Sequence, residues 1–265
     1  MSNIVKFEFK QYYKQAIYWS IAIICFQLIF VIMFPAFSND VDSLNKLLNS
    51  YDPTLLKGFG LGDIGLDKFS GFYSFCLVYI IMIVAIYSIN IGLNIIGKEA
   101  KFKTNDFLLT KPINRLNIMK DKILVALILV LGLNVIYTIA IIISVLLSGI
   151  EIEFITLLLF GIGMLFTSFL FLSIGIFIAC YKHKIKSSIT LAIGITSIAF
   201  VIEMIANVLD NTIVNLLSPL SYLSPNYIAS NNCLDISMLI LTIVLTVLFI
   251  ILGVKHYIKK DIYNN

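Results

Sequence analysis

The chain has 265 residues, of which 60% are hydrophobic and 13% are charged, and its mean hydropathy is +0.99. A soluble domain is roughly half apolar and about a quarter charged, so this composition excludes a soluble protein and indicates an integral membrane protein. The formal net charge is only +4. The distribution of the charges along the chain is therefore more informative than their sum.

Six stretches are long and apolar enough to cross a bilayer as helices. A spanning helix needs about 20 mostly apolar residues, because only a helix satisfies its own backbone polar groups in lipid. The sequence therefore predicts an all-α, polytopic fold, with residues 1–265 forming a single transmembrane domain. The predicted spans are residues 16–34, 72–96, 123–147, 154–179, 189–206 and 236–253.

The basic residues are distributed unequally between the two sides that these spans define. Sixteen of the 19 Lys and Arg residues fall on the side that carries both termini, and only Lys46, Lys57 and Lys68 fall on the other. Loops rich in Lys and Arg face the cytoplasm. The sequence thus predicts a multi-pass protein of the cell membrane with both termini in the cytoplasm. This topological role explains the basic residues without a nucleic-acid partner.

Lysines also recur regularly before the first span. Lys6, Lys10 and Lys14 are four residues apart, with apolar and aromatic residues between them. This spacing predicts a short N-terminal helix that lies in the inner membrane interface, with its lysines toward the headgroups. An ordinary lysine-rich flank of the first span explains the same residues equally well.

The chain lacks the motifs of the common nucleotide, metal and hydrolase sites. Residues 60–65 match G-x-G-x-x-G, but no strand precedes them and their loop is predicted to lie outside the membrane, so the match is attributed to chance. No Gly-Lys-Ser/Thr ending of a P-loop occurs, and His183 and His256 lie in predicted cytoplasmic flanks. We therefore expect no catalytic residues, no metal ligands and no cofactor in this chain. The four cysteines show no disulfide or metal spacing: Cys25, Cys76, Cys180 and Cys233.

Polar and small residues mark one face of two predicted spans. Asn90 and Asn94 share a face of the second span near its cytoplasmic end. Such residues most often form hydrogen bonds between helices, and lining a transport pathway is the alternative. In the fourth span Gly161, Ser168 and Gly175 recur every seven residues, which predicts a close helix contact.

Glu203 is an ionisable residue within the fifth predicted span, about one turn from its outer end if Asn207 marks the boundary. Thr196 lies one heptad earlier on the same face. Two interpretations are open: a functional site within the membrane, or a side chain that reaches water at the helix end. The loop that follows, residues 207–235, contains no Lys or Arg, and we expect short helices that dip into the outer leaflet and cap a cavity between protomers.

The largest charged island lies between the second and third spans. This polar segment, residues 98–122, contains seven basic residues and an apolar cluster at residues 107–109. Pro112 is expected to stop one short helix and Asn114 to cap the next, which leads into the third span. An exposed apolar cluster commonly marks a docking surface. Packing of the cluster on the protein's own inner surface is the alternative.

The polar segment resembles the cytoplasmic loop of type-2 ATP-binding-cassette (ABC) transporter permeases, specifically the small six-span subunits of bacterial exporters. Those loops contain a glutamate, a Gly-Thr pair, a Leu-Leu pair, a proline and an arginine. Here Lys103 replaces the usual glycine. The resemblance implies a cytoplasmic coupling helix that seats in a groove of a separate ATPase. The coupling residues that it implies are Glu99, Lys103, Thr104, Phe107, Leu108, Leu109, Pro112 and Arg115.

The resemblance also implies a function. Two permeases, identical or homologous, would form the pathway in the lipid bilayer, and two copies of an ABC ATPase subunit would bind ATP and Mg. Export of an antimicrobial peptide or an antibiotic, and hence antibiotic resistance, is the expected role because small permeases of this class often have it. An ATP-independent carrier or channel with Glu203 in its pathway is the alternative. An intramembrane enzyme is disfavoured by the missing motifs.

Overall fold

The computed structural model describes residues 3–39, 50–61, 65–66, 68–102, 114–182, 185–209 and 212–259. This part of the chain contains helices and no strands, and six of its helices are long and apolar enough to cross a membrane. The predicted all-α, six-span fold is therefore confirmed. The six long helices are α1 (Asn3–Asn39), α4 (Phe69–Phe102), α6 (Arg115–Ser148), α7 (Phe154–Tyr181), α8 (Ser188–Leu209) and α11 (Ile236–Lys259).

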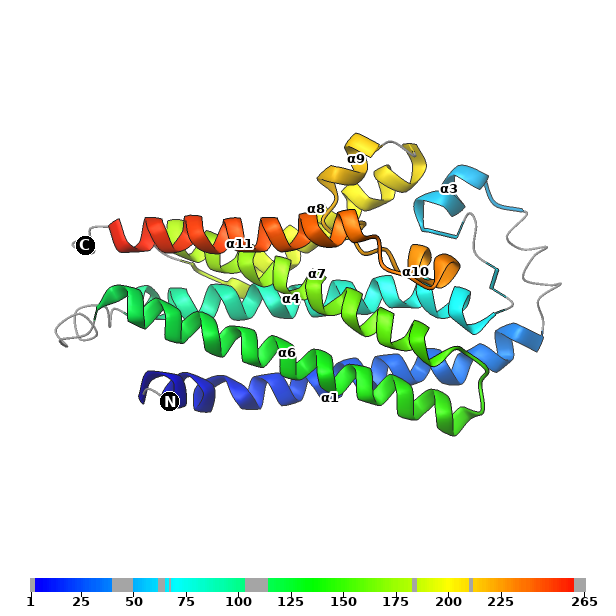
Figure 1. The fold of residues 1–265 in the computed structure, drawn as a ribbon, viewed down its shortest axis with the longest axis horizontal. Helices are drawn as coiled ribbons and strands as arrows, with labels where there is room; N and C mark the ends of the chain where they lie inside the picture. The colour runs from blue at the N-terminus through cyan, green and yellow to red at the C-terminus, as the bar shows by residue number, and fades with distance from the viewer. Residues whose placement is uncertain are drawn as a thin grey trace.

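The N-terminal residues do not form a separate interfacial helix. Residues 3–39 form one continuous helix, α1, which contains both the spaced lysines and the first span (Figure 1). No Gly or Pro occurs before Pro35, so nothing in the local sequence ends a helix between the two parts. The predicted division at residue 16 is wrong, although a lysine-bearing flank of the first span is consistent with this helix.

The helices α4 and α6 also extend beyond the apolar stretches that predicted them. α6 begins at Arg115, eight positions before the predicted span, because Asn114 caps it: the Asn114 side-chain oxygen accepts a hydrogen bond from Leu116 N at 3.0 Å. The predicted cap is thus confirmed. α4 continues to Phe102, so the two ends of the polar segment are helical.

The core of the bundle is a close contact between α4 and α7. A Cβ added to Gly175 of α7 would lie 2.6 Å from the backbone oxygen of Ile89 in α4, and one added to Gly92 would lie 2.7 Å from the oxygen of Leu172. Only glycine permits backbones to approach this closely. The predicted stripe of small residues does make close contacts, but with two helices: Gly175 meets α4, whereas a Cβ added to Gly161 would lie 2.4 Å from Thr138 Oγ1 of α6. Around the pair, α1 packs on α6 and α4, α8 packs on α4, and α11 packs on α7.

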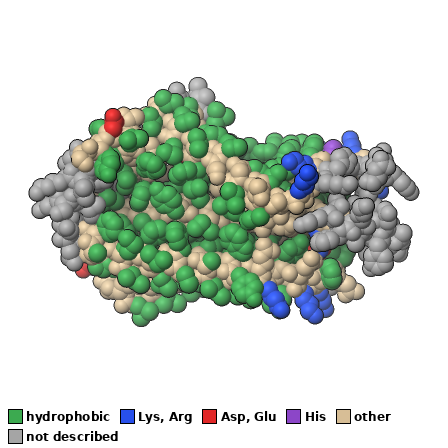
Figure 2. Space-filling model, turned by 180° about the vertical axis from the view of Figure 1, so that it is seen from behind, with side chains coloured by type: hydrophobic (Ala, Val, Ile, Leu, Met, Phe, Trp, Pro, Cys, Tyr) green, Lys and Arg blue, Asp and Glu red, His purple; other side chains and the backbone are tan. Residues whose placement is uncertain are grey.

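The two ends of the bundle differ in their charged residues and in the helices that they contain. Both termini lie at one end, together with the last turn of α4 and the first turn of α6, whereas the short helices α3 (Pro53–Gly58), α9 (Thr212–Leu217) and α10 (Pro225–Asn231) lie at the other (Figure 1). Figure 2 shows hydrophobic side chains over the middle of one face, with Lys and Arg side chains gathered at the end that carries the termini. The arrangement matches the charge asymmetry read from the sequence.

The short helices form a cap on the end opposite the termini. α9 and α10 confirm the short helices expected within residues 207–235. α10 packs on α4 and α7, and Asn226 at its start donates a hydrogen bond to the backbone oxygen of Gly60 at 3.1 Å. α3 packs on α8. The cap therefore joins loops that are far apart in the sequence.

Candidate coupling site

The structure describes the two helical ends of the polar segment. Glu99 lies in the last turn of α4, and Arg115 is the first residue of α6. The remaining predicted coupling residues lie outside the described residues, so their roles stay predictions: Lys103, Thr104, Phe107, Leu108, Leu109 and Pro112.

A buried ion pair joins these two helical ends. The Lys122 ammonium of α6 donates to Glu99 Oε1 of α4 and to the backbone oxygen of Ile95 at 2.9 Å. The side chain of Lys122 is 2% exposed and that of Glu99 is 10% exposed. Charges removed from water are tolerated only when they are paired and hydrogen-bonded, and this lysine satisfies both conditions. The pair therefore connects α4 to α6 where the polar segment begins and ends.

A second ion pair ties α1 to the adjacent residue of α4. Lys98 donates to Glu8 Oε2 and, at 2.6 Å, to Gln11 Oε1. Its ammonium also lies 5.1 Å from the ring centroid of Phe7 and 5.5 Å from that of Tyr12, within cation–π range. The side chains of Lys98 and Glu8 are 11% and 3% exposed. The first turns of α1 are thus held against the end of α4.

We refer to Glu8, Lys98, Glu99 and Lys122 as the charge cluster. Because Lys98 and Glu99 are consecutive, one turn of α4 is fixed to α1 on one side and to α6 on the other. Breaking either pair would leave a buried charge without its partner, which is costly. The end of α4 is therefore linked directly to both α1 and α6, an arrangement that suits mechanical transmission.

Lys122 and Glu8 are not predicted for this role from the sequence: Lys122 counts there only as one of the seven basic residues of the polar segment, and Glu8 is not singled out. A periodicity signal for Lys122 was available. It lies three and four residues from the apolar residues Met119 and Ala126, and all three positions are buried on one face of α6. A lysine on the buried face of a spanning helix requires a partner. The sequence alone does not say which one.

The two asparagines of the second span form hydrogen bonds with each other and with a neighbouring helix. Asn94 donates to Asn90 Oδ1 at 2.9 Å, and Ser188 at the start of α8 donates to Asn94 Oδ1 at 2.9 Å. This geometry favours the interhelical interpretation of these residues. It also places the start of α8 beside α4, one turn from the charge cluster.

Comparison with known proteins agrees with the geometry. The family model described as "ABC-2 family transporter protein" matches residues 2–262, nearly the whole chain. The chain belongs to the ABC-2 family of transporter proteins. A search of the curated proteins found no match. The protein is therefore a membrane permease subunit of an ABC transporter, as the polar segment indicated, and it is a transport subunit rather than a catalytic one.

In this ABC-2 permease, Glu203 is a buried carboxyl rather than one that reaches water at a helix end. The residue is 5% exposed, and its Oε2 has no hydrogen-bond partner among the described residues. Thr196 Oγ1, on the same face of α8, is likewise buried without a partner there. Within the described part of the chain, no group of three or more His, Cys, Asp or Glu residues could hold a metal ion.

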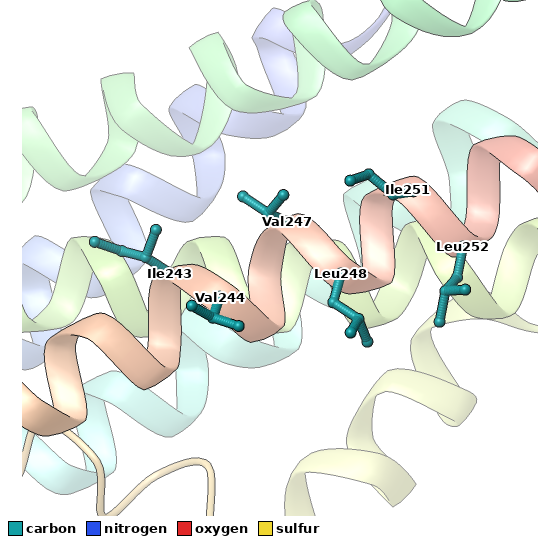
Figure 3. Close-up of a pocket in the computed structure, with 6 residues that line it drawn as sticks. All are labelled: Ile243, Val244, Val247, Leu248, Ile251 and Leu252. Carbon is teal, nitrogen blue, oxygen red and sulfur yellow. The ribbon is translucent and has the colours of Figure 1, made fainter.

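A shallow groove on the permease surface is apolar throughout. It lies along α11, and Figure 3 shows the six aliphatic side chains that line it, all from this one helix. Such a lining suits lipid acyl chains and offers no hydrogen bond to a polar cargo. The lining residues are Ile243, Val244, Val247, Leu248, Ile251 and Leu252.

Proposed function

We propose that this ABC-2 permease is an exporter subunit that receives its energy from a separate ATPase through the polar segment. The observation that carries the proposal is the charge cluster at the root of that segment. Its two ion pairs connect α1, α4 and α6, so force applied to the segment reaches three spanning helices at once. A loop that only connects two spans would not require two buried ion pairs beside its ends.

The apolar cluster at residues 107–109 is the expected contact with the ATPase. Buried apolar anchors contribute most of the energy in protein interfaces. Two ATPase subunits would bind ATP and Mg and close beneath two permeases, identical or homologous. Binding of ATP can shift the membrane domain only if the docked segment has different contacts in the two states. In this proposal the segment and both termini face the cytoplasm, and the protein lies in the cell membrane.

The proposed cargo is an antimicrobial peptide or an antibiotic, in keeping with the small size of the permease. The described residues support a membrane-embedded route rather than a soluble binding domain, because the long helices and the cap account for nearly all of them. A cargo that partitions into lipid could approach such a body from the bilayer. Resistance to a membrane-active antibiotic would be the resulting phenotype.

The experiment that tests the proposal is co-purification of the permease with its ATPase. We expect the combined Leu108→Glu and Leu109→Glu substitutions to abolish recovery of the ATPase and the stimulation of its hydrolysis by cargo. Lys120→Glu is the matched control, because Lys120 is exposed on the first turns of α6 and its replacement changes the charge of the same region without touching the apolar cluster. Unchanged recovery and hydrolysis in the double variant would refute the docking role.

The buried Glu203 favours one alternative function, an ATP-independent carrier or channel with this carboxyl in its pathway. The two functions are separated by reconstitution of the permease alone in liposomes. Uptake or release of cargo without any ATPase would favour the carrier. Transport that needs the ATPase and ATP would favour the exporter.

A further inference from the structure

Glu203 lies on the one face of α8 that is buried in the bundle. The buried residues of this helix are Ala192, Thr196, Ala199, Glu203 and Ala206, which recur every three or four positions and so share a side. α8 packs on α4, where Phe200 contacts Tyr79 with ring centroids 6.2 Å apart. Alanines one turn before and after Glu203 leave its carboxyl as the large polar group of this face.

No cation is paired with this carboxyl in the described part of the chain. From α4, the titratable group that interacts with it electrostatically is Tyr79, which is neutral when protonated. From α3, Lys57 is exposed and Asp52 is engaged in capping its own helix, where it accepts a hydrogen bond from Thr54 N at 2.7 Å. The group in electrostatic range of Glu203 is thus a phenol, and Glu203 Oε2 has no hydrogen-bond partner in the described part of the chain.

The helix α3 covers the turn of α8 that follows Glu203. A Cβ added to Gly58, the last residue of α3, would lie 3.3 Å from Val208 Cγ2 and 3.9 Å from the backbone oxygen of Met204. Asn207 also donates to the backbone oxygen of Gly58 at 3.4 Å. A side chain at Gly58 would crowd Val208, so glycine suits this close packing of α3 on α8. α3 therefore covers the last turn of α8, which lies between Glu203 and this end of the bundle.

An ionised carboxylate in this environment would be both desolvated and unpaired, and the neutral acid is much less costly to bury. We propose that Glu203 is a proton-binding site in the membrane domain, which holds its proton while α3 packs on α8 and releases it to water when the two helices separate. In the release step the O–H bond of the carboxyl breaks, the proton passes to water, and the carboxylate that remains is hydrated. The ligand of the site is the proton.

A proton-binding site at Glu203 lies outside the coupling segment of the proposed function, and it does not depend on the energy source of transport. The site can be tested in the purified full-length permease without an ATPase. A negative result in the co-purification experiment would not contradict the proton-binding site. An ionised Glu203 at neutral pH would not contradict the coupling role.

The test uses dicyclohexylcarbodiimide, an apolar reagent that adds to protonated carboxyls within membranes. The acid proton passes to a reagent nitrogen, the carboxylate bonds to the reagent carbon, and rearrangement gives a stable N-acylurea with no leaving group. Peptide mass spectrometry then locates the adduct. We expect labelling of Glu203 at neutral pH that falls as the pH rises, with no labelling of the exposed Glu151 at neutral pH.

Infrared spectroscopy covers the case in which the reagent cannot reach the site. A carbonyl stretch of a protonated carboxyl should be present at neutral pH, should be absent in Glu203→Gln, and should persist in Glu151→Gln. The glutamine is neutral and of similar shape, so it preserves the packing. A carboxylate band at neutral pH that Glu203→Gln removes would show an ionised Glu203 and would overturn the proposal.

The role of α3 is tested by Gly58→Leu, whose side chain begins 3.3 Å from Val208 Cγ2 and is expected to push α3 away from α8. We expect the pH at which half of Glu203 is labelled to fall by at least about one unit, which corresponds to a tenfold lower affinity of Glu203 for the proton. Leu55→Ala, at an exposed position of the same helix, is the matched control and should leave that pH unchanged. An unchanged value in Gly58→Leu would refute the covering role of α3.

Discussion

Replacement of Lys122 by methionine tests the charge cluster most directly. The substitution keeps an unbranched side chain of similar length but removes the charge that pairs with Glu99 and the hydrogen bond to the backbone oxygen of Ile95. Glu99 would then be a carboxylate with a 10% exposed side chain and without its lysine. Loss of one partner of a buried ion pair destabilises a protein by about 3–5 kcal/mol.

We expect a loss near the lower limit, about 3 kcal/mol, because the small exposed part of Glu99 allows some hydration. The assay is unfolding of the purified permease in mixed micelles with increasing sodium dodecyl sulfate. Lys120→Met is the matched control, two residues earlier on the same helix and exposed, and its effect should stay within about 0.5 kcal/mol.

A double substitution separates charge from packing. Lys122→Met combined with Glu99→Leu removes both charges from the buried site, so the unfolding free energy should recover most of the loss. Stimulation of ATP hydrolysis by cargo should not recover, because the rigid link between α4 and α6 is gone. The reasoning would be refuted if Lys122→Met were no more destabilising than Lys120→Met, or if the double variant were less stable than the single one.

Two further predictions concern the α4–α7 contact and the start of α11. Gly175→Val should reduce the yield of monodisperse protein and lower the free energy of unfolding by about 3 kcal/mol or more, because its Cβ would meet the backbone of Ile89. Gly132→Val is the control, because a Cβ at Gly132 has open space around it, and this variant should fold normally. Equal yields of the two variants would contradict the close contact. Asp235 caps α11 by accepting hydrogen bonds from the Ser237 hydroxyl and from Ser237 N at 2.9 Å, and these bonds lower the pKa of its carboxyl. The native state therefore binds this proton more weakly than the unfolded chain, so the cap contributes stability above about pH 4 and loses it as the pH falls further. Asp235→Ala should cost about 1 kcal/mol at neutral pH and Asp235→Asn much less, both measured by thermal unfolding, and equal losses would contradict the capping role.

Several features of this protein could be predicted from the sequence because they depend on local chemistry. A spanning helix can be recognised from its own length and apolarity, so all six spanning helices were predicted. The cap at Asn114 depends on one side chain and the backbone two residues on. The seven-residue spacing of Gly161, Ser168 and Gly175 is a property of one helix, and it indicated close contacts without showing that Gly161 and Ser168 meet α6 and Gly175 meets α4.

The tertiary structure decided which residues meet. Glu99 and Lys122 are 23 positions apart and Glu8 and Lys98 are 90 apart, and no local pattern relates either pair. The packing of α3 on the turn of α8 that follows Glu203 likewise involves Gly58, which lies far from this turn in the sequence. A pattern along one helix fixes which side is buried, but the packing of that side against other helices determines its partners. The identity of an ion pair or the covering of a carboxyl is therefore set only when the whole bundle is assembled.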